Sequence, residues 1–194
     1  MLVRAMVWNC EIELVAPRTN PFEESFFKSE FDFVAMVPLQ VETILEDSSS
    51  TELLKTIENL IIGGAPISQK LQRKLVIKNI NAFQTFGMTE TASHFALAEI
   101  TDKELIYQAL PGVQIGVNSH RLLWVSSAMS GPDPIQTNDE VDLVSENRFR
   151  WLGRSDFVIN SGGVKLHPEL IEQKVEIQIY HFFPEVPFFF GSLP

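Results

Sequence analysis

A threonine beside a glutamate, in the string F-G-M-T-E-T from residues 86–91, is the pair best suited to chemistry at a nucleotide. The hydroxyl of Thr89 can donate a hydrogen bond to a phosphate oxygen. The carboxylate of Glu90 can help to hold the Mg²⁺ that neutralises phosphates. An apolar, β-rich segment over residues 81–85 precedes the pair, so we expect it where a strand ends. The alternative is that both residues only cap a helix.

Two glycines end a second apolar run, in the string I-I-G-G-A-P over residues 61–66. Because glycine has no Cβ, backbone at such a position can approach a ligand closely. Gly63, Gly64 and Ala65 can therefore line a ligand site, although a tight strand-to-helix turn would use the same residues. His94 follows the Thr-Glu pair; a lone histidine is more often structural, and a place in a substrate pocket is the alternative.

Taken together, these strings resemble the signature of the acyl-adenylate-forming (AMP-binding) ligases. That family includes acyl-CoA synthetases, luciferases and nonribosomal adenylation domains. The resemblance implies that the ring of Phe86 packs on adenine, with Gly87 in the same nucleotide-binding motif. It further implies that Thr89 contacts phosphate, that Glu90 holds Mg²⁺, and that the loop of residues 63–65 lies against adenine and the acyl group.

The segment Q-T-N-D-E-V-D-L…L-G-R-S-D…S-G-G-V-K-L-H-P-E-L-I-E, residues 136–172, extends this resemblance and is the most specific part of it. It implies that Asp139 accepts hydrogen bonds from both ribose hydroxyls and that Arg154 contacts the nucleotide. Asp156 matches the hinge aspartate about which a C-terminal lid domain rotates. The residues that match the mobile loop facing the thiol acceptor are Gly162, Gly163 and Lys165.

Two residues depart from the family's pattern at positions where it has glycine. Asn138 stands in one of them, and we expect it to adopt a positive φ, which asparagine tolerates. Arg121 stands in the other, within residues 110–127, a stretch that resembles antiparallel scaffold strands of the family and to which we assign no site.

Within the family, several passages are most similar to the 2-succinylbenzoate–CoA ligases of menaquinone biosynthesis. These passages are VRAMVWNCEIELVAP, FVAMVPLQVETIL, FGMTETASHFALA and INSGGVKLHPELIE. The resemblance implies an enzyme that uses ATP, Mg²⁺ and CoA to activate a carboxylic acid as acyl-AMP and then transfer it to CoA. Arg73, Arg121 and His94 are three open alternatives for the group that would meet a second substrate carboxylate.

Two parts of such a ligase have no counterpart in this sequence. The family's Ser/Thr/Gly-rich phosphate loop would lie upstream of Met1, and its catalytic lysine would lie in the C-terminal domain, beyond Lys174, the last lysine here. We therefore expect the chain to be a central segment of the enzyme that is inactive alone. The alternatives are a non-catalytic remnant that binds a nucleotide or a partner protein, with a homodimer as one form, and an incomplete reading of a longer gene.

The elements that must position these residues follow from hydrophobic periodicity and turn signals. We expect an initial hairpin of strands over residues 2–8 and 11–15, then strand and helix in alternation, which predicts a mixed, mainly parallel sheet in an α/β fold. Strands are predicted over residues 31–37 and 60–62, and helices over 39–47, 51–59, 68–77 and from Pro168 to about 178. Five short strands, over 104–108, 113–117, 121–126, 140–144 and 148–152, predict a small antiparallel, barrel-like subdomain. The expected divisions are an α/β part (1–100), the antiparallel part (101–153), and the hinge with the start of the lid (154–194).

Composition limits the partners. The 194 residues carry a formal net charge of −10, which argues against nucleic acid and against an anionic membrane surface. The single cysteine, Cys10, excludes an internal disulfide. We expect a cytoplasmic protein in a reducing compartment whose partners are small molecules.

Overall fold

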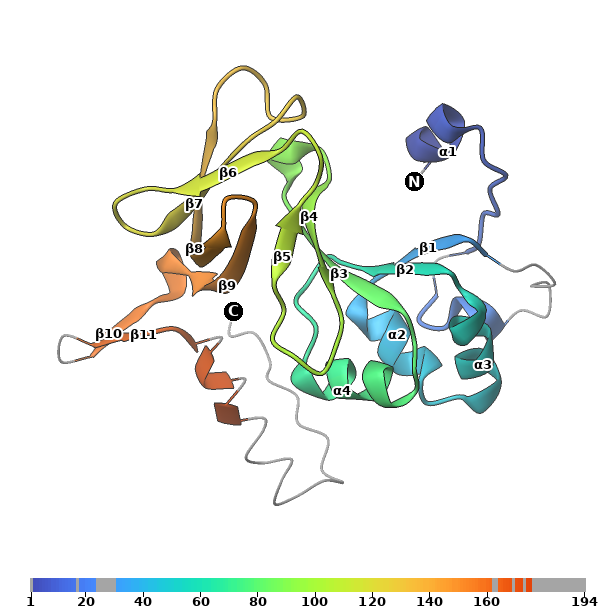
Figure 1. The fold of residues 1–194 in the computed structure, drawn as a ribbon. Coiled ribbons are helices and arrows are strands. Elements are labelled where there is room, and N and C mark those ends of the chain that lie inside the picture. Colours follow the sequence, from blue (N-terminus) through green and yellow to red (C-terminus); the bar gives the residue numbers. More distant parts are fainter. Residues whose placement is uncertain are drawn as a thin grey trace.

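The computed structural model describes residues 2–16, 18–23, 31–161, 164–168, 170–172 and 174–175. Its centre is one mixed sheet of nine strands in the order β1-β2-β3-β4-β5-β9-β8-β7-β6 (Figure 1). The strands are β1 (Phe33–Met36), β2 (Asn59–Ile62), β3 (Ala82–Gly87), β4 (His94–Glu99), β5 (Tyr107–Ala109), β6 (Gln114–Val117), β7 (Leu122–Ser126), β8 (Ile135–Ser145) and β9 (Arg148–Arg154). The predicted α/β class is confirmed, but the antiparallel part stays an open continuation of the sheet, with β6 at its edge, and does not close into a barrel.

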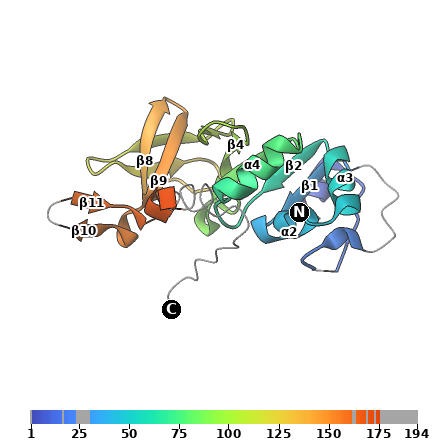
Figure 2. The same ribbon diagram turned by 90° about the horizontal axis from the view of Figure 1, so that it is seen from below.

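Strands β1, β2 and β3 pair in parallel, as the alternation of strand and helix predicts. The connections between them run through α2 (Pro38–Ile44), α3 (Ser48–Thr56) and α4 (Gln69–Ile77), which gather on one side of these strands (Figures 1 and 2). The helices and the strands bury a shared apolar core that includes Leu54, Leu60, Ile62, Leu71 and Leu75. Burial of this many large apolar side chains is the main force that holds the layer together.

The predicted break between two helices at residues 48–50 is wrong, because these serines form the first turn of α3. Asp47 caps the helix: its Oδ2 accepts from the backbone N–H of Ser50 at 2.7 Å and from the hydroxyl of Ser49 at 2.6 Å. Those hydrogen bonds, the one from Ser49 foremost, lower the pKa of Asp47 from 3.8 to about 2. The stabilising contribution of this cap to folding is therefore fully present above pH 3.8, and it is lost as the pH falls through about 2.

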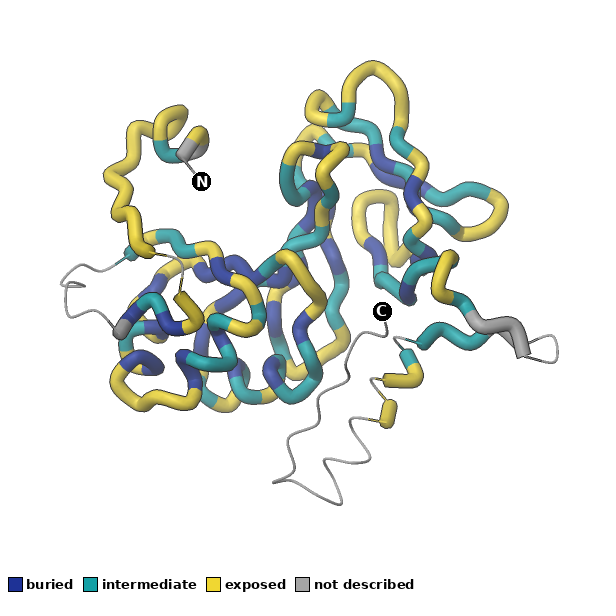
Figure 3. Tube along the Cα trace, turned by 180° about the vertical axis from the view of Figure 1, so that it is seen from behind, coloured by how far each residue is buried: buried dark blue, intermediate teal, exposed yellow. Residues whose placement is uncertain are grey.

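The predicted N-terminal hairpin is also wrong. Residues Leu2–Trp8 form the helix α1, and residues 10–16 have no regular structure. Cys10 N–H donates to the carbonyl of Ala5 at 2.9 Å, and Asn9 takes a left-handed φ of 53°. Hydrogen bonds within the segment thus satisfy its backbone N–H and C=O groups. In a strand, the same groups would need a neighbouring strand as their partner. Most of the α1 side chains whose burial is described are exposed (Figure 3), and Trp8 at the end of the helix meets Phe33 of β1 edge-on, with ring centroids 6.5 Å apart.

Strand β4 was not predicted, and it links the parallel and antiparallel parts of the sheet. It pairs antiparallel with β3 on one side and with β5 on the other. The five predicted antiparallel strands are present as β5 to β9, although β8 is longer than expected. A second core, formed around the buried rings of Phe95, Tyr107 and Phe149, packs beneath this region.

Beyond β9 the described chain forms a 3₁₀ turn (Ser155–Phe157) and a two-stranded hairpin of β10 (Ile159–Ser161) and β11 (Val164–Leu166). The helix predicted to start at Pro168 does start there, and the N–H groups of Leu170 and Ile171 both donate to the carbonyl of His167. The His167 side chain is 10% exposed, and its Nε2 lies 3.4 Å from a carboxylate oxygen of the buried Glu140 on β8. The predicted end of this helix lies outside the described residues. In the described part of the chain, none of the helices has the length and apolarity that a membrane crossing requires.

We predict that Ser68→Ala destabilises the protein by about 1 kcal/mol, the usual cost of losing an N-cap. The Ser68 hydroxyl oxygen accepts from the N–H of Leu71 at 3.0 Å at the start of α4, and alanine leaves that donor without its partner. Urea unfolding followed by circular dichroism measures the change. Ser119→Ala, in an exposed turn, is the matched control; equal midpoints for the two variants would contradict the prediction.

Candidate functional site

The glycine loop after β2 is fastened to β3 by a buried glutamine. Gln84 Oε1 accepts from the N–H of Ile67 at 3.1 Å, and its Nε2 lies 3.2 Å from the carbonyl oxygens of both Ile62 and Ala65. One side chain therefore satisfies backbone groups on both sides of the two glycines. Sequence reasoning missed Gln84; the available signal was one amide within the apolar run of residues 82–86.

Both glycines of the loop are needed where they stand. A Cβ on Gly63 would lie 2.2 Å from Thr85 Oγ1, so the loop backbone touches β3 directly. Gly64 has a φ of +89°, which side chains other than glycine rarely adopt. The loop thus lies beside the strand that leads into the F-G-M-T-E-T motif.

That motif forms the end of β3 and a 3₁₀ turn over Thr89–Thr91. The buried Thr91 hydroxyl oxygen accepts from Met88 N–H at 3.3 Å and lies within hydrogen-bonding distance of the carbonyls of Met88 and Ser93. Thr89 and Glu90 are exposed on this turn. The expectation that the Thr-Glu pair follows a strand is confirmed, and Thr91, which sequence reasoning did not single out, holds the turn in shape.

Asp139 and Arg154 are directly opposite each other on the paired strands β8 and β9. The indole N–H of Trp151 donates to Asp139 Oδ1 at 2.9 Å, and the Asp139 backbone N–H donates to Thr137 Oγ1 at 3.0 Å. Burial raises the pKa of Asp139 above 3.8, against the opposing effects of the Trp151 hydrogen bond and the Arg154 charge. An aspartate with a raised pKa inside a polar cluster is a common feature of functional sites.

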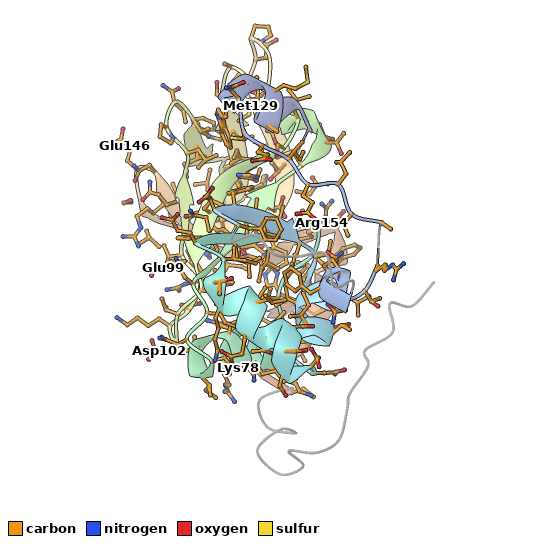
Figure 4. The ribbon with its side chains drawn as sticks, turned by 90° about the vertical axis from the view of Figure 1, so that its right-hand side faces the viewer. Lys78, Glu99, Asp102, Met129, Glu146 and Arg154 are labelled. Atoms are coloured by element: carbon orange, nitrogen blue, oxygen red, sulfur yellow. The ribbon has the colours of Figure 1, made fainter. Side chains whose placement is uncertain are left out.

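Arg154 also binds the predicted hinge residue. Its Nε and one Nη donate to the two carboxylate oxygens of Asp156 at 3.0 and 2.8 Å, a two-point ion pair. The hydrogen bond from Arg154 is the main cause of a lowered pKa for Asp156. In Figure 4, Arg154 is labelled between Met129 at the top and Lys78 at the bottom. Preceding it, Gly153 is buried with a φ of +143°, so this position also requires glycine.

Aromatic contacts join the two ends of the site. Phe86 packs edge-on against Trp151, with ring centroids 6.5 Å apart, and Trp151 in turn holds Asp139. Three further rings surround Phe86, those of Phe95, Tyr107 and Phe149. The fold thus brings the F-G-M-T-E-T motif against the strands that carry Asp139 and Arg154, across more than fifty residues of sequence.

The remaining predicted residues lie in different settings. His94 is half-buried opposite Gly87 at an irregularity between β3 and β4, with its Nδ1 3.4 Å from the Ser93 hydroxyl. Arg73 is exposed on α4. Lys165 pairs through its backbone with Asn160, whereas its side chain, like Gly162 and Gly163, lies outside the described residues.

The two residues at the family's glycine positions differ in conformation. Asn138 lies within β8 and does not have the positive φ that we expected. An extended strand needs no left-handed residue there, so asparagine fits without strain. Arg121, by contrast, has a φ of 64° just before β7, and its guanidinium pairs with the carboxylate of Asp142.

Among the residues that the structure describes, no three His, Cys, Asp or Glu side chains gather into a metal-binding group. Mg²⁺ in nucleotide sites is usually held by one or two carboxylates together with phosphates. The exposed Glu90 carboxylate, on a turn after β3, fits that kind of site.

The sequence model of the AMP-binding enzyme family matches residues 10–121, more than half of the chain. The chain belongs to the AMP-binding enzyme family. Matching solved structures of adenylate-forming ligases have the same fold in the region compared.

Two curated relatives carry the name 2-succinylbenzoate–CoA ligase. That of Lactococcus lactis subsp. lactis is 27% identical over 174 residues, which cover 80% of this chain and 38% of the relative. That of Haemophilus influenzae is 25% identical over 191 residues, which cover 89% of this chain and 41% of the relative. The chain therefore spans about two fifths of the length of these relatives.

Two solved structures extend the comparison. An acyl-CoA synthetase (AMP-forming)/AMP-acid ligase II-like protein from Dyadobacter fermentans has a TM-score of 0.68 and 37% identity, over 89% of this chain and 49% of that protein. O-Succinylbenzoate coenzyme A synthetase from Bacillus subtilis, in complex with ATP and magnesium, has a TM-score of 0.62 and 19% identity, over 81% and 38% of the two chains. The second likeness shows the fold alone.

We predict that Gly63→Ala destabilises the protein by about 1–3 kcal/mol, because the new methyl overlaps Thr85 Oγ1. Thr85→Ala removes that oxygen, so the double variant should recover most of the loss. Urea unfolding of the wild type, both single variants and the double variant gives the coupling energy between the positions. Additive effects would show that the loop and β3 are not in contact as described.

We predict that Asp139→Asn raises the urea midpoint at pH 7. Because burial raises the pKa of Asp139, the folded state loses stability as the pH rises from 3.8 and the carboxylate ionises. Asparagine has no charge to bury, so its advantage should be largest at neutral pH and shrink as the pH falls toward 3.8. Asp133→Asn, in an exposed loop, is the matched control, and a lower midpoint for Asp139→Asn at pH 7 would be the contrary result.

Proposed function

We propose that this chain is a segment of an ATP-dependent acid–CoA ligase and carries part of its nucleotide and acyl sites. The observation that supports this most strongly is the contact of Phe86 with Trp151, which is itself bonded to Asp139. Two motifs that the family would use on one nucleotide therefore adjoin in a chain that belongs to that family. A cytoplasmic location is part of the proposal, since a protein with one cysteine suits a reducing compartment.

The proposed reaction has two half-reactions. An oxygen of the substrate carboxylate attacks the α-phosphorus of ATP, the bond to the bridging oxygen breaks, and pyrophosphate leaves. The sulfur of CoA, having lost its proton, then attacks the acyl carbon of the acyl-AMP. The anhydride bond between the acyl carbon and the phosphate oxygen breaks, AMP leaves, and a thioester is formed.

Each proposed role matches the chemistry of its side chain. Asp139 would accept hydrogen bonds from the ribose hydroxyls, and Arg154 would contact the nucleotide beside it. Thr89 would donate to a phosphate oxygen. Glu90 would be a ligand of Mg²⁺, which supplies positive charge to the phosphates when it is bound.

The glycine loop of residues 63–65 and the ring of Phe86 would lie along adenine and the acyl group. The proposed acid is 2-succinylbenzoate, by similarity to the named relatives, and His94 is a proposed residue of its pocket. Asp156 is the proposed hinge, and Gly162, Gly163 and Lys165 the proposed loop toward the thiol. The divisions at residues 1–100, 101–153 and 154–194 are proposed on the same basis.

The alternative is a non-catalytic nucleotide- or partner-binding protein of the same family. The exposed apolar side chains of α1, namely Val3, Met6 and Val7, favour it, because exposed apolar surface often marks a contact with another chain. The ligase proposal accounts in addition for the cluster around Asp139, which a surface for protein contact does not require.

We predict that the chain binds AMP weakly and that Asp139→Asn lowers the affinity about tenfold or more, the usual effect of losing a hydrogen bond to a charged group. Chemical-shift titration with AMP measures both dissociation constants in the millimolar range. Asp133→Asn controls for the loss of one negative charge, which by itself would favour an anionic ligand.

Equal affinity of Asp139→Asn and wild type for AMP would contradict the proposed role of Asp139. Shifts confined to residues far from Phe86, Trp151 and Arg154 would contradict the proposed site as a whole.

A further inference from the structure

Trp151 contacts both Asp139 and Phe86, and it has no role of its own in the proposed reaction. Its indole has one polar hydrogen, and that hydrogen points to Asp139 Oδ1 at 2.9 Å. A donor bound to a carboxylate makes a stronger hydrogen bond than a neutral pair. Trp151 therefore constrains the rotation of a carboxylate that is partly removed from water.

The arginine opposite Asp139 is engaged elsewhere. Arg154 is its strand partner, yet the guanidinium donates through Nε and an Nη to Asp156. Its charge still lowers the pKa of Asp139, and so does a hydrogen bond from the Thr137 side chain, but the largest of these effects is the hydrogen bond from Trp151. The orientation of the carboxylate thus depends on the tryptophan.

The other end of Trp151 is set by the aromatic cluster. Its ring meets that of Phe86 at a centroid distance of 6.5 Å and an interplanar angle of 61°. Phe86 is itself enclosed by three other rings and is followed by Gly87, where any Cβ would collide with the backbone of His94. The indole is therefore held at both ends, by packed rings and by a carboxylate.

We propose that Trp151 is a positioning residue that orients Asp139 toward the sugar of a bound nucleoside and sets its spacing from Phe86. The indole N–H takes one of the four lone-pair positions of the carboxylate and the Thr137 side chain another, which leaves two for two sugar hydroxyls. This inference rests on the proposed function of Asp139. Its consequence is that the preference for a nucleoside with hydroxyls depends on an indole that does not touch them.

Titration of the full chain with adenosine and with 2′,3′-dideoxyadenosine tests this. The wild type should bind adenosine more tightly, and Trp151→Phe should reduce that preference about fivefold, on the order of one weakened hydrogen bond to a charged group. The affinity for dideoxyadenosine should stay the same, because a ring remains beside Phe86. Trp124→Phe, a tryptophan on β7 that packs over Gly116, is the matched control and should keep the full preference.

A second readout does not depend on how well the Trp151→Phe variant folds. The indole ¹⁵N–¹H resonance of Trp151, identified among three tryptophans by elimination with Trp8→Phe and Trp124→Phe, should move in Asp139→Asn. It should also move when adenosine is added to the wild type, and stay in place with dideoxyadenosine. An indole signal that adenosine leaves unmoved while it binds would overturn the proposal.

The outcomes separate this inference from the proposed function. Loss of the hydroxyl preference in Asp139→Asn but not in Trp151→Phe overturns the role of Trp151 and leaves that of Asp139 intact. A preference that persists in both variants overturns the proposed role of Asp139 and, with it, that of Trp151. Loss in both variants, with Trp124→Phe unaffected, supports the positioning role.

Discussion

The double pairing of β4 is the constraint on which the rest of the structure depends. Its backbone hydrogen-bonds to β3 on one side and to β5 on the other, so a parallel α/β layer and an antiparallel meander become one sheet. Because β5 then pairs with β9, and β9 with β8, the end of β3 lies within a few strands of Asp139 and Arg154. Motifs distant in sequence meet because the ladder of backbone hydrogen bonds is continuous.

The candidate site lies at the border of an apolar core, where most of the polar groups have hydrogen-bond partners. Phe95 and Phe149 are fully buried beneath it, while the polar side chains of Gln84 and Thr91 are hydrogen-bonded to backbone. Asp139 differs, because burial of its carboxylate disfavours the charged form. A carboxylate held by Trp151 at a cost in stability is expected at a candidate binding site rather than in a purely structural core.

The resemblance to a ligase family named the candidate functional residues but not their conformations. At one glycine position, Arg121 takes the left-handed backbone and its guanidinium pairs with Asp142, whereas at the other Asn138 is extended within β8. The prediction of an N-terminal hairpin was wrong for another reason. Residues 2–8 alternate like a strand, yet their backbone bonds internally as α1 and pairs with none of the described strands.

The sequence alone determined the βαβ order, the start of α4 at the Ser68 cap and the start of a helix at Pro168, and its resemblance to a family named the motifs of a candidate nucleotide site. Caps, turns and periodicity act over a few residues and so can be read directly. Only the tertiary structure shows the position of β4, the open sheet, and the hydrogen bonds that Gln84 and Trp151 make. Strand partners and buried polar contacts are chosen between residues far apart in the chain, and no local pattern records which distant group will complete them.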